Sequence, residues 1–368
     1  MADPSGAGQP KPVTEVTARG TLRFLVMRYS SLGDVALTNP VLDLLRYSWP
    51  DSEIHFATKP AFAPAVAGHP ALTRVIPYRG FLAHLKALRA LGPTMVVDLH
   101  DSLRTWALTR LLSRGNPALR VLTYDKESVG RRLIVSKIRK APSLHTVEKY
   151  LKPLMSMGAL HPRDEIGLTV HPTRYGLGYA RDFMERRRVS TSQLVVGMAP
   201  GARWATKRWP AERWSELASR LVESRDCLLL WFGSEEEKGM IAGIQSAMTG
   251  LPSRRGANLA GQCTLEETIA LLGRCDVVVS HDSGLMHLAV GRGARVVALF
   301  GSTTTDLGFA PLGREHIVVE CTGLSCRPCH VHGRRWCPKG HFRCMKDLTV
   351  DLVEGALDRA IGKTRKGN

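Results

Sequence analysis

The sequence predicts an α/β protein built from two Rossmann-like domains that face each other across a central cleft. Short apolar segments rich in β-branched residues alternate with amphipathic helical segments, first in one half of the chain and then in the other. This alternation is typical of βαβ units on a parallel sheet. At roughly 100–200 residues per domain, a chain of 368 residues has room for two such units.

The first half shows the alternation clearly. Apolar segments predict strands at Phe24–Met27, Ile54–Ala57, Arg74–Pro77, Met95–Leu99 and Arg120–Thr123. Amphipathic segments predict helices at Val35–Tyr47, Leu82–Leu91 and Leu103–Leu112.

The second half repeats the pattern. Its apolar segments predict strands at Leu194–Met198, Cys227–Phe232, Asp276–Ser280 and Arg295–Phe300. Its amphipathic segments predict helices at Ala211–Ser224, Glu236–Met248, Leu265–Gly273 and Gly284–Val290. Turn residues at Glu165–Gly178 are typical of a linker between the halves.

These segments give the expected domain boundaries. We expect a disordered tail over residues 1–20, an N-terminal domain over 21–172 and a C-terminal domain over 173–349, which carries a cysteine-rich insert over 321–346. A helix with a basic tail should follow over 350–368.

Composition excludes several classes of protein. With 44% hydrophobic and 23% charged residues, the chain can bury a large core, which excludes disorder throughout. No apolar run approaches the roughly 18–20 residues that span a bilayer, and the first residues contain no apolar signal segment. We therefore expect a cytoplasmic protein. Its net charge of +18 suits nucleic acid, an anionic membrane face or phosphorylated substrates.

Ligands of parallel sheets bind at the carboxyl ends of the strands, so the residues there are the first candidates. After the first strand, Gly33 permits a tight turn and Asp34 stands at a helix N-terminus. Asp34 is either a helix cap, which its local sequence favours, or a general base at the mouth of a cleft.

A second candidate follows the strand at Leu194–Met198. A Pro-Gly turn, Thr206 and Lys207 precede a helix there, which offers free backbone N–H groups, a hydroxyl and a cation to a phosphate. The Walker A pattern is absent. The alternative is a solvated basic loop.

A third candidate follows the strand at Asp276–Ser280. The N–H groups of Ser283 and Gly284 should point at an anion from a helix N-terminus. Asp282 is suited to bind sugar hydroxyls, and His287 lies one turn into the helix. A lone histidine on a helix is more often structural, but the neighbouring acid and glycine favour a function here.

Three motifs occur in order along the chain: SSLGDV, PGARWATKRWP and HDSGLMHLAVGRGARVVALFGSTT. Together they resemble the ADP-heptose:lipopolysaccharide heptosyltransferases, glycosyltransferase family 9, over nearly all of residues 21–361. The resemblance implies a GT-B fold, with the acceptor on the N-terminal domain and the nucleotide sugar on the C-terminal domain.

The resemblance also implies the reaction. Heptose would pass from ADP-heptose to a lipopolysaccharide inner-core acceptor with inversion and without a catalytic metal, in agreement with the absence of a DxD motif. Asp34 matches the catalytic base and Lys207 the diphosphate-binding lysine. The remaining donor-binding positions are Thr206, Glu236 for the ribose, in a register left open, and Asp282, Ser283, Gly284 and His287.

Basic residues are concentrated in the expected acceptor domain. Residues 101–140 contain ten basic and three acidic side chains. A phosphorylated glycolipid acceptor at the inner membrane face would suit this charge, and so would peripheral binding of the protein there. The alternative is a solvated helix face. The sequence leaves the oligomeric state open.

Four cysteines cluster near the end of the chain: Cys326, Cys329, Cys337 and Cys344. Such a cluster in a cytosolic chain suits one tetrahedral zinc or iron ion, with His330, His332 and His341 as spare ligands. Reduced thiols or two disulfides are the alternatives. We expect a structural or assembly role away from the cleft.

Two other classes of function use some of these features. An NAD-dependent oxidoreductase needs GxGxxG after a strand, and the nearest match is Gly176-Leu177-Gly178, which lacks the third glycine. A zinc-ribbon nucleic-acid-binding protein would explain the charge and the cysteines but not the loops at the strand ends. Within the family, another nucleotide sugar or a protein acceptor is the alternative.

Overall fold

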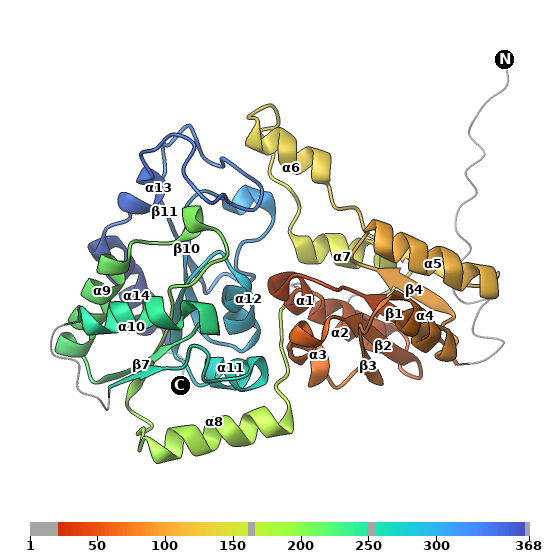
Figure 1. Ribbon diagram of the computed structural model, residues 1–368, viewed down its shortest axis with the longest axis horizontal. Helices are drawn as coiled ribbons and strands as arrows, with labels where there is room; N and C mark the ends of the chain where they lie inside the picture. Colours follow the sequence, from red (N-terminus) through yellow and green to blue (C-terminus); the bar gives the residue numbers. More distant parts are fainter. Residues whose placement is uncertain (1–20, 161–165, 249–254, 365–368) are drawn as a thin grey trace.

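Two α/β halves lie side by side in the computed structural model (Figure 1). The structure describes residues 21–160, 166–248 and 255–364. The tail expected over 1–20 and the start of the expected linker at Glu165 lie outside the described residues. None of the described helices is both long enough and apolar enough to cross a membrane.

The first half contains a parallel sheet in the order β3-β2-β1-β4-β5. The chain order reverses between β1 and β4, which makes a switch point where ligands of such sheets bind. Apolar residues of the three central strands are buried because helices cover both faces. The strands are β1 (Arg23–Met27), β2 (Glu53–Thr58), β3 (Arg74–Pro77), β4 (Met95–Asp98) and β5 (Arg120–Thr123).

The second half contains a parallel sheet in the order β11-β10-β9-β6-β7-β8. Its switch point lies between β6 and β9. The strands are β6 (Leu194–Ala199), β7 (Cys227–Trp231), β8 (Gly256–Asn258), β9 (Val277–His281), β10 (Arg295–Phe300) and β11 (Ile317–Glu320). Our sequence analysis missed β8 and β11, the two short strands at the edges.

One predicted helix of the first half is two helices. The segment predicted over Val35–Tyr47 divides into α1 and α2 because Pro40 stands at the start of α2 and has no N–H to continue the first helix. The helices of this half are α1 (Leu32–Ala36), α2 (Asn39–Ser48), α3 (Pro64–Ala67), α4 (Phe81–Ala90), α5 (Leu103–Gly115), α6 (Ser128–Val135) and α7 (Thr146–Met155).

The linker prediction is partly wrong, because α8 begins inside it at Arg174. The Thr173 hydroxyl accepts a hydrogen bond from Gly176 N at 3.1 Å and caps this helix. Gly176 and Gly178 are therefore helical, which removes the nearest match to a dinucleotide-binding loop. The helices are α8 (Arg174–Arg186), α9 (Ala211–Ser224), α10 (Lys238–Ser246), α11 (Leu265–Leu272), α12 (Gly284–Gly291), α13 (Arg343–Lys346) and α14 (Val350–Thr364).

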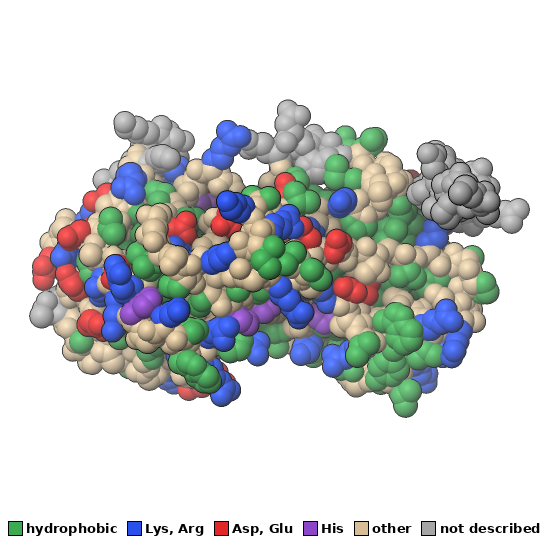
Figure 2. Space-filling view, turned by 90° about the horizontal axis from the view of Figure 1, so that it is seen from above, with side chains coloured by type: hydrophobic (Ala, Val, Ile, Leu, Met, Phe, Trp, Pro, Cys, Tyr) green, Lys and Arg blue, Asp and Glu red, His purple; other side chains and the backbone are tan. Residues whose placement is uncertain are grey.

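The two halves meet where α1 packs against α12 and α3 against α11. Glycines allow the first contact: a Cβ on Gly33 would lie 2.9 Å from Cδ2 of His287 and 3.3 Å from Cα of Gly284. The linker joins the same region, since Val170 N donates to the Gly291 carbonyl at 2.7 Å. Seen from above, Lys, Arg and His side chains gather along the middle of the molecule (Figure 2).

Candidate active site

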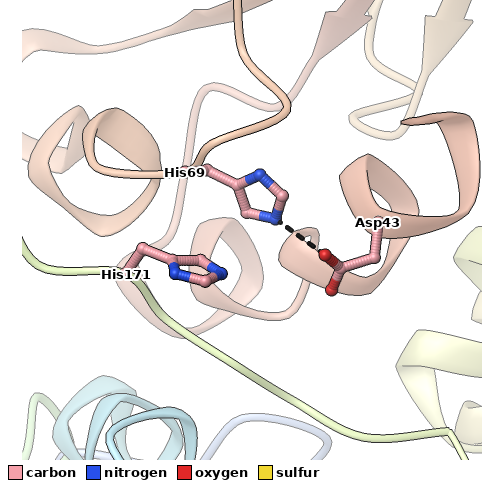
Figure 3. A group of neighbouring side chains, drawn as sticks. All are labelled: Asp43, His69 and His171. Atoms are coloured by element: carbon pink, nitrogen blue, oxygen red, sulfur yellow. Dashed lines mark ion pairs between the residues drawn. The ribbon is translucent and has the colours of Figure 1, made fainter. Parts of the chain in front are cut away.

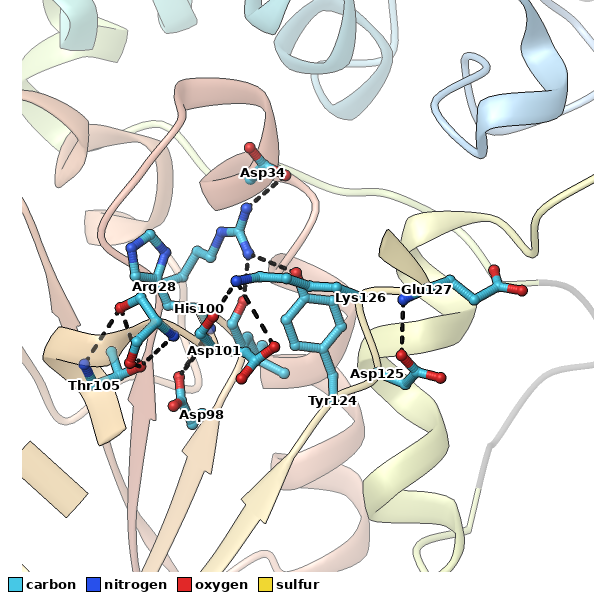
Figure 4. Close-up of polar contacts among 12 residues, drawn as sticks. Arg28, Asp34, Asp98, His100, Asp101, Thr105, Tyr124, Asp125, Lys126 and Glu127 are labelled. Atoms are coloured by element: carbon cyan, nitrogen blue, oxygen red, sulfur yellow. Dashed lines mark hydrogen bonds and ion pairs between the residues drawn. The ribbon is translucent and has the colours of Figure 1, made fainter. Parts of the chain in front are cut away.

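Asp34 lies in the first turn of α1, and both of its carboxylate oxygens have partners (Figure 4). Oδ2 accepts hydrogen bonds from Ser31 N at 2.9 Å and Ser31 Oγ at 2.6 Å. Oδ1 lies 2.7 Å from Nη2 of Arg28 and 3.4 Å from the Tyr150 hydroxyl. Asp34 is thus the N3 residue of a capping box whose N-cap is Ser31. It also pairs with Arg28, a contact that the local sequence did not predict.

Arg28 holds this carboxylate in its ionised form. Its guanidinium also donates to the Leu99 carbonyl and, at 3.1 Å, to the Tyr124 hydroxyl. Burial alone would raise the pKa of Asp34, but the Arg28 charge and the hydrogen bonds from Ser31 lower it further than burial raises it. The pKa of Asp34 therefore lies below its ordinary value, and the side chain is a carboxylate at neutral pH.

Lys207 and Asp282 form an ion pair in the C-terminal half. Nζ of Lys207 lies 2.6 Å from Oδ2 of Asp282 and 3.2 Å from its carbonyl oxygen. The Thr303 hydroxyl donates to the same Oδ2 at 2.8 Å. Burial raises the pKa of Asp282, but Lys207 and Thr303 outweigh it, so the pKa is lowered. The carboxylate comes from the end of β9, and the lysine from the short 3₁₀ turn η4 (Ala205–Lys207).

The N-terminus of α12 abuts the N-terminus of α1 at this point. Ser283 is the N-cap residue of α12, and Gly284 opens the helix directly against Leu32 and Gly33. His287 lies one turn further on; it is buried, and its Nδ1 has no hydrogen-bond partner among the described residues. Burial lowers the pKa of His287 to about 4, so its imidazole is neutral at pH 7.

Two other predicted site residues have different surroundings. The Thr206 hydroxyl accepts a hydrogen bond from Arg334 N at 2.8 Å and lies 3.0 Å from Ser302 Oγ, so it is already engaged within the protein. Glu236 is exposed, whereas its neighbour Glu237 lies against Gly201 of the Pro-Gly turn. Contacts of Thr206 and Glu236 with a donor stay predictions.

Sequence reasoning did not select several residues that shape the site. His281 is the last residue of β9 and is fully buried. It accepts from Trp209 N at 2.8 Å through Nε2, and its Nδ1 lies 3.3 Å from the Gly201 carbonyl, so it fixes the loop that carries Lys207. Arg28 and His281 stand at or directly after strand ends, and that position was the signal that could have found them.

The loops after β4 and β5 form the surroundings of Arg28 in the N-terminal half. Asp98 accepts hydrogen bonds from the backbone N–H groups of His100 and Asp101, at 2.9 and 3.0 Å. Burial lowers the pKa of His100 to about 4, with the Arg28 and Lys126 charges acting in the same direction. Lys126 reaches back to Asp101, 3.7 Å away, and ties the two loops together (Figure 4).

The four clustered cysteines line one cavity of about 250 Å³ together with His341. Cys326 Sγ lies 3.8 Å from His341 Nε2, and none of the described cysteines is in a disulfide. Burial raises the pKa of Cys344 to about 12. Lys137 of the N-terminal half and Thr206 line the same cavity. Our expectation that this segment lies away from the cleft is therefore wrong.

A second group of metal-ligand type lies at the start of the linker (Figure 3). Asp43, His69 and His171 place one ligand atom each within 4.8 Å of one another. However, Ala71 N donates to His69 Nδ1 at 3.1 Å, so the proton of a neutral His69 is on Nε2, 3.3 Å from Asp43 Oδ1. A metal-bound histidine normally donates its other ring N–H, so this arrangement favours a histidine–carboxylate pair over a metal site.

Comparison with known proteins connects this geometry to a family. The model of glycosyltransferase family 9 (heptosyltransferase) matches residues 81–338. Lipooligosaccharide heptosyltransferase 2 of Haemophilus ducreyi is 31% identical over 185 residues, 49% of this chain and 51% of that protein. Lipopolysaccharide heptosyltransferase 1 of Pseudomonas aeruginosa is 27% identical over 354 residues, 89% of this chain and 91% of that protein. The chain thus spans about half the length of the first relative and most of the second.

Solved structures show the same fold. The ADP-heptose lipopolysaccharide heptosyltransferase II of Escherichia coli superposes with a TM-score of 0.73 at 21% identity, over 94% of this chain and all of that one. A dodecameric, iron-containing heptosyltransferase in complex with ADP-D-β-D-heptose superposes with a TM-score of 0.58 at 13% identity, over 94% of this chain and 77% of that one.

Proposed function

This chain belongs to glycosyltransferase family 9, the heptosyltransferase family, and from that premise we propose that it transfers a heptose from ADP-heptose to a lipopolysaccharide inner-core acceptor. The observation that carries the proposal is the contact of α1 with α12 through Gly33 and Gly284. This contact brings the first turn of α1, which contains Asp34, against the N-terminus of α12, which follows Asp282, the partner of Lys207.

Asp34 is the general base in this mechanism. The acceptor hydroxyl replaces the long contact from Tyr150 and gives its proton to Oδ1 of Asp34, while its oxygen attacks the anomeric carbon of the sugar. The bond from that carbon to the diphosphate oxygen breaks on the opposite face, so the configuration inverts. Because the Arg28 charge lowers the pKa of Asp34, Asp34 is ionised at neutral pH but is a weak base, and proton transfer is late.

The donor half stabilises the departing diphosphate without a metal ion. Lys207 supplies a cation, and Ser283 and Gly284 supply backbone N–H groups at a helix N-terminus. Asp282, tied to Lys207 and Thr303, orients that lysine and binds sugar hydroxyls. Thr206 belongs to the same short turn as Lys207 and contributes its hydroxyl to the donor-binding loop. Glu236 contacts the ribose, with Glu237 the nearer acid to the Pro-Gly turn.

The acceptor is a phosphorylated glycolipid at a membrane face. Residues 101–140 carry ten basic and three acidic side chains. On α5, Leu103 is 87% and Trp106 65% exposed, one turn apart, and Arg110 follows on the same face. Exposed apolar side chains beside cations suit peripheral binding at an anionic bilayer.

The cysteine cavity holds one structural zinc or iron ion, with Cys326, Cys329, Cys337 and Cys344 as ligands. The four cysteines line a single cavity, and thiolates are the ligands that a tetrahedral zinc or iron site prefers; among the described residues, however, the only three ligand-type side chains within 4.8 Å of one another are Asp43, His69 and His171, so the thiols would have to move together around the ion. A thiol with a pKa of about 12, such as Cys344, ionises at neutral pH only when a cation replaces its proton. The iron-containing relative supports this assignment.

A binding screen followed by one variant tests the function. ADP should bind more tightly than GDP or UDP. Asp34→Asn should reduce transfer roughly 10²–10⁴-fold while ADP affinity stays within about twofold, because general-base catalysis contributes about that factor. Preference for another nucleotide would indicate a different donor. Salt-dependent binding to DNA without nucleotide binding would refute the transferase mechanism.

A further inference from the structure

The cysteine-rich segment is anchored beside the loop that carries Lys207. Arg334 N donates to the Thr206 hydroxyl at 2.8 Å, and Thr206 N donates to the Arg334 carbonyl at 3.1 Å. Gly333 has a φ of +104°, and a Cβ there would lie 2.8 Å from Cβ of Trp204. Only glycine fits this close approach, so residues 333–334 are held against residues 204–206.

A second set of contacts holds the other end of the segment. Cys329 N donates to the Ser302 carbonyl at 3.0 Å, and Nη2 of Arg327 donates to the Thr303 carbonyl at 2.9 Å. Lys137, which follows α6 of the N-terminal half, donates to the Arg327 carbonyl. The segment therefore bridges the two halves, with its middle fixed between them.

His330 and His332 lie in this fixed middle. His332 N donates to Nδ1 of His330 at 3.0 Å. Burial lowers the pKa of His332 first, followed by the charge of Lys207; Asp34 raises it and Arg131 lowers it. The position of His332 follows from its neighbours, since Gly333 packs against Trp204 and Arg334 N donates to the Thr206 hydroxyl, directly before Lys207. The residue is exposed to solvent, although part of its ring lies against the protein, which accounts for the effect of burial on its pKa.

The donor site needs a further hydrogen-bond donor. Lys207 is paired with Asp282 at 2.6 Å, so part of its charge is already compensated before a diphosphate binds. His287 is buried and neutral. A diphosphate that gains negative charge as it leaves would therefore be stabilised by a further donor in addition to Lys207 and the N–H groups of α12. A neutral, solvent-exposed imidazole beside the donor site can supply one N–H to the diphosphate.

We propose that the His332 imidazole donates a hydrogen bond to the β-phosphate of the bound nucleoside diphosphate, so that the cysteine-rich segment forms a third wall of the active site. This inference rests on the proposed function, because it requires the donor diphosphate to lie beside Lys207. It gives the segment a substrate-binding role that is independent of any metal ion in the cysteine cavity.

Calorimetric binding of ADP and AMP to the full chain tests this assignment, because AMP lacks the β-phosphate. His332→Ala should weaken ADP binding on the order of ten- to hundredfold, the value of a hydrogen bond to a charged group. AMP binding should change less than about twofold. His332→Gln keeps an N–H donor and should recover part of the loss. Arg335→Ala, an exposed change in the same segment, is the matched control.

The outcomes separate this inference from the function on which it rests. If wild-type protein binds ADP more tightly than AMP and His332→Ala keeps that ratio, the inference is wrong and the proposed function stands. Equal losses of ADP and AMP would also contradict it, because they indicate a damaged pocket. Wild-type protein that binds neither nucleotide would overturn both. Unchanged melting temperature and thiol count in each variant exclude misfolding of the segment.

Discussion

Removal of the Arg28 charge should change how Asp34 titrates. Arg28→Met keeps most of the aliphatic length but leaves the carboxylate with Ser31 and the distant Tyr150 hydroxyl as partners. In the wild-type protein the Arg28 charge outweighs burial and lowers the pKa of Asp34. In the variant burial is no longer opposed by that charge, so the pKa should rise.

The structure sets the size of the stability effect. The two side chains are 8% and 17% exposed, so this is a buried ion pair. Removal of one partner from a buried pair costs roughly 3–5 kcal/mol. For a domain of about 150–250 residues, each 1 kcal/mol corresponds to about 2–4 °C, so the melting temperature should fall by roughly 6–20 °C at neutral pH.

The pH dependence follows from the direction of the pKa shift. A carboxyl whose pKa is lower in the folded than in the unfolded protein stabilises the fold above its unfolded pKa, and this stabilisation is lost as the pH falls through the folded pKa. The difference in stability between wild type and Arg28→Met should therefore be largest near neutral pH. It should shrink in acid, where Asp34 is protonated in both proteins.

Calorimetry from pH 7 down to pH 4 and the pH profile of kcat/KM measure the two effects. The acid limb of the profile should move to higher pH in Arg28→Met. Arg186→Met, at an exposed arginine of α8 outside the basic region 101–140, is the control and should leave both measurements unchanged. An acid limb that stays in place in a folded Arg28→Met protein would refute the reasoning about the Asp34 base.

Three further changes test other parts of the site. Lys207→Ala should weaken ADP binding on the order of ten- to hundredfold through loss of a charge-assisted contact; unchanged calorimetric affinity would contradict the phosphate role. Gly33→Ala places a methyl group 2.9 Å from His287 and should slow transfer, whereas Gly178→Ala has open space and should not; equal rates would show that the α1–α12 contact is not critical. Cys344→Ser should remove about one zinc or iron ion per chain by elemental analysis; a metal-free wild type would exclude the site.

Most of the strands could be predicted from the sequence because they are short runs rich in β-branched and other apolar residues. Arg74–Pro77, Arg120–Thr123 and Arg295–Phe300 agree with the structure to the residue. The strand at Gly256–Asn258 could not be found, because its three residues include a glycine and an asparagine and its pairing depends on β7. Proline at position 40 is a visible signal that should have divided α1 from α2.

The positions of the site loops could be predicted, but their partners could not. Asp34, Lys207 and Asp282 follow strand ends, and parallel strands bring such residues to one edge of each sheet. The pairing of Arg28 with Asp34 depends on the Tyr124 hydroxyl and the Leu99 carbonyl, which come from two other strand ends. No local pattern contains that information.

The location of the cysteine-rich segment in the fold could not be predicted from the sequence either. Its spacing indicates a metal site but contains no signal for the contact of Gly333 with Trp204, about 130 positions earlier in the chain. That contact is decided by shape, since it requires a residue without a side chain over an indole ring. Prediction of a role away from the cleft failed for this reason.

Each half contains an ion pair at the candidate site. For this reason the packing of the two halves, more than net charge, determines the distance between the base and the donor site. Arg28 neutralises Asp34 in one half, and Asp282 neutralises Lys207 in the other. Neither pair attracts the other strongly, so long-range charge does not bring base and donor together. The glycine contact between α1 and α12 sets their separation instead. If the excess positive charge of the chain serves the proposed acceptor, ionic strength should affect acceptor KM more than ADP affinity.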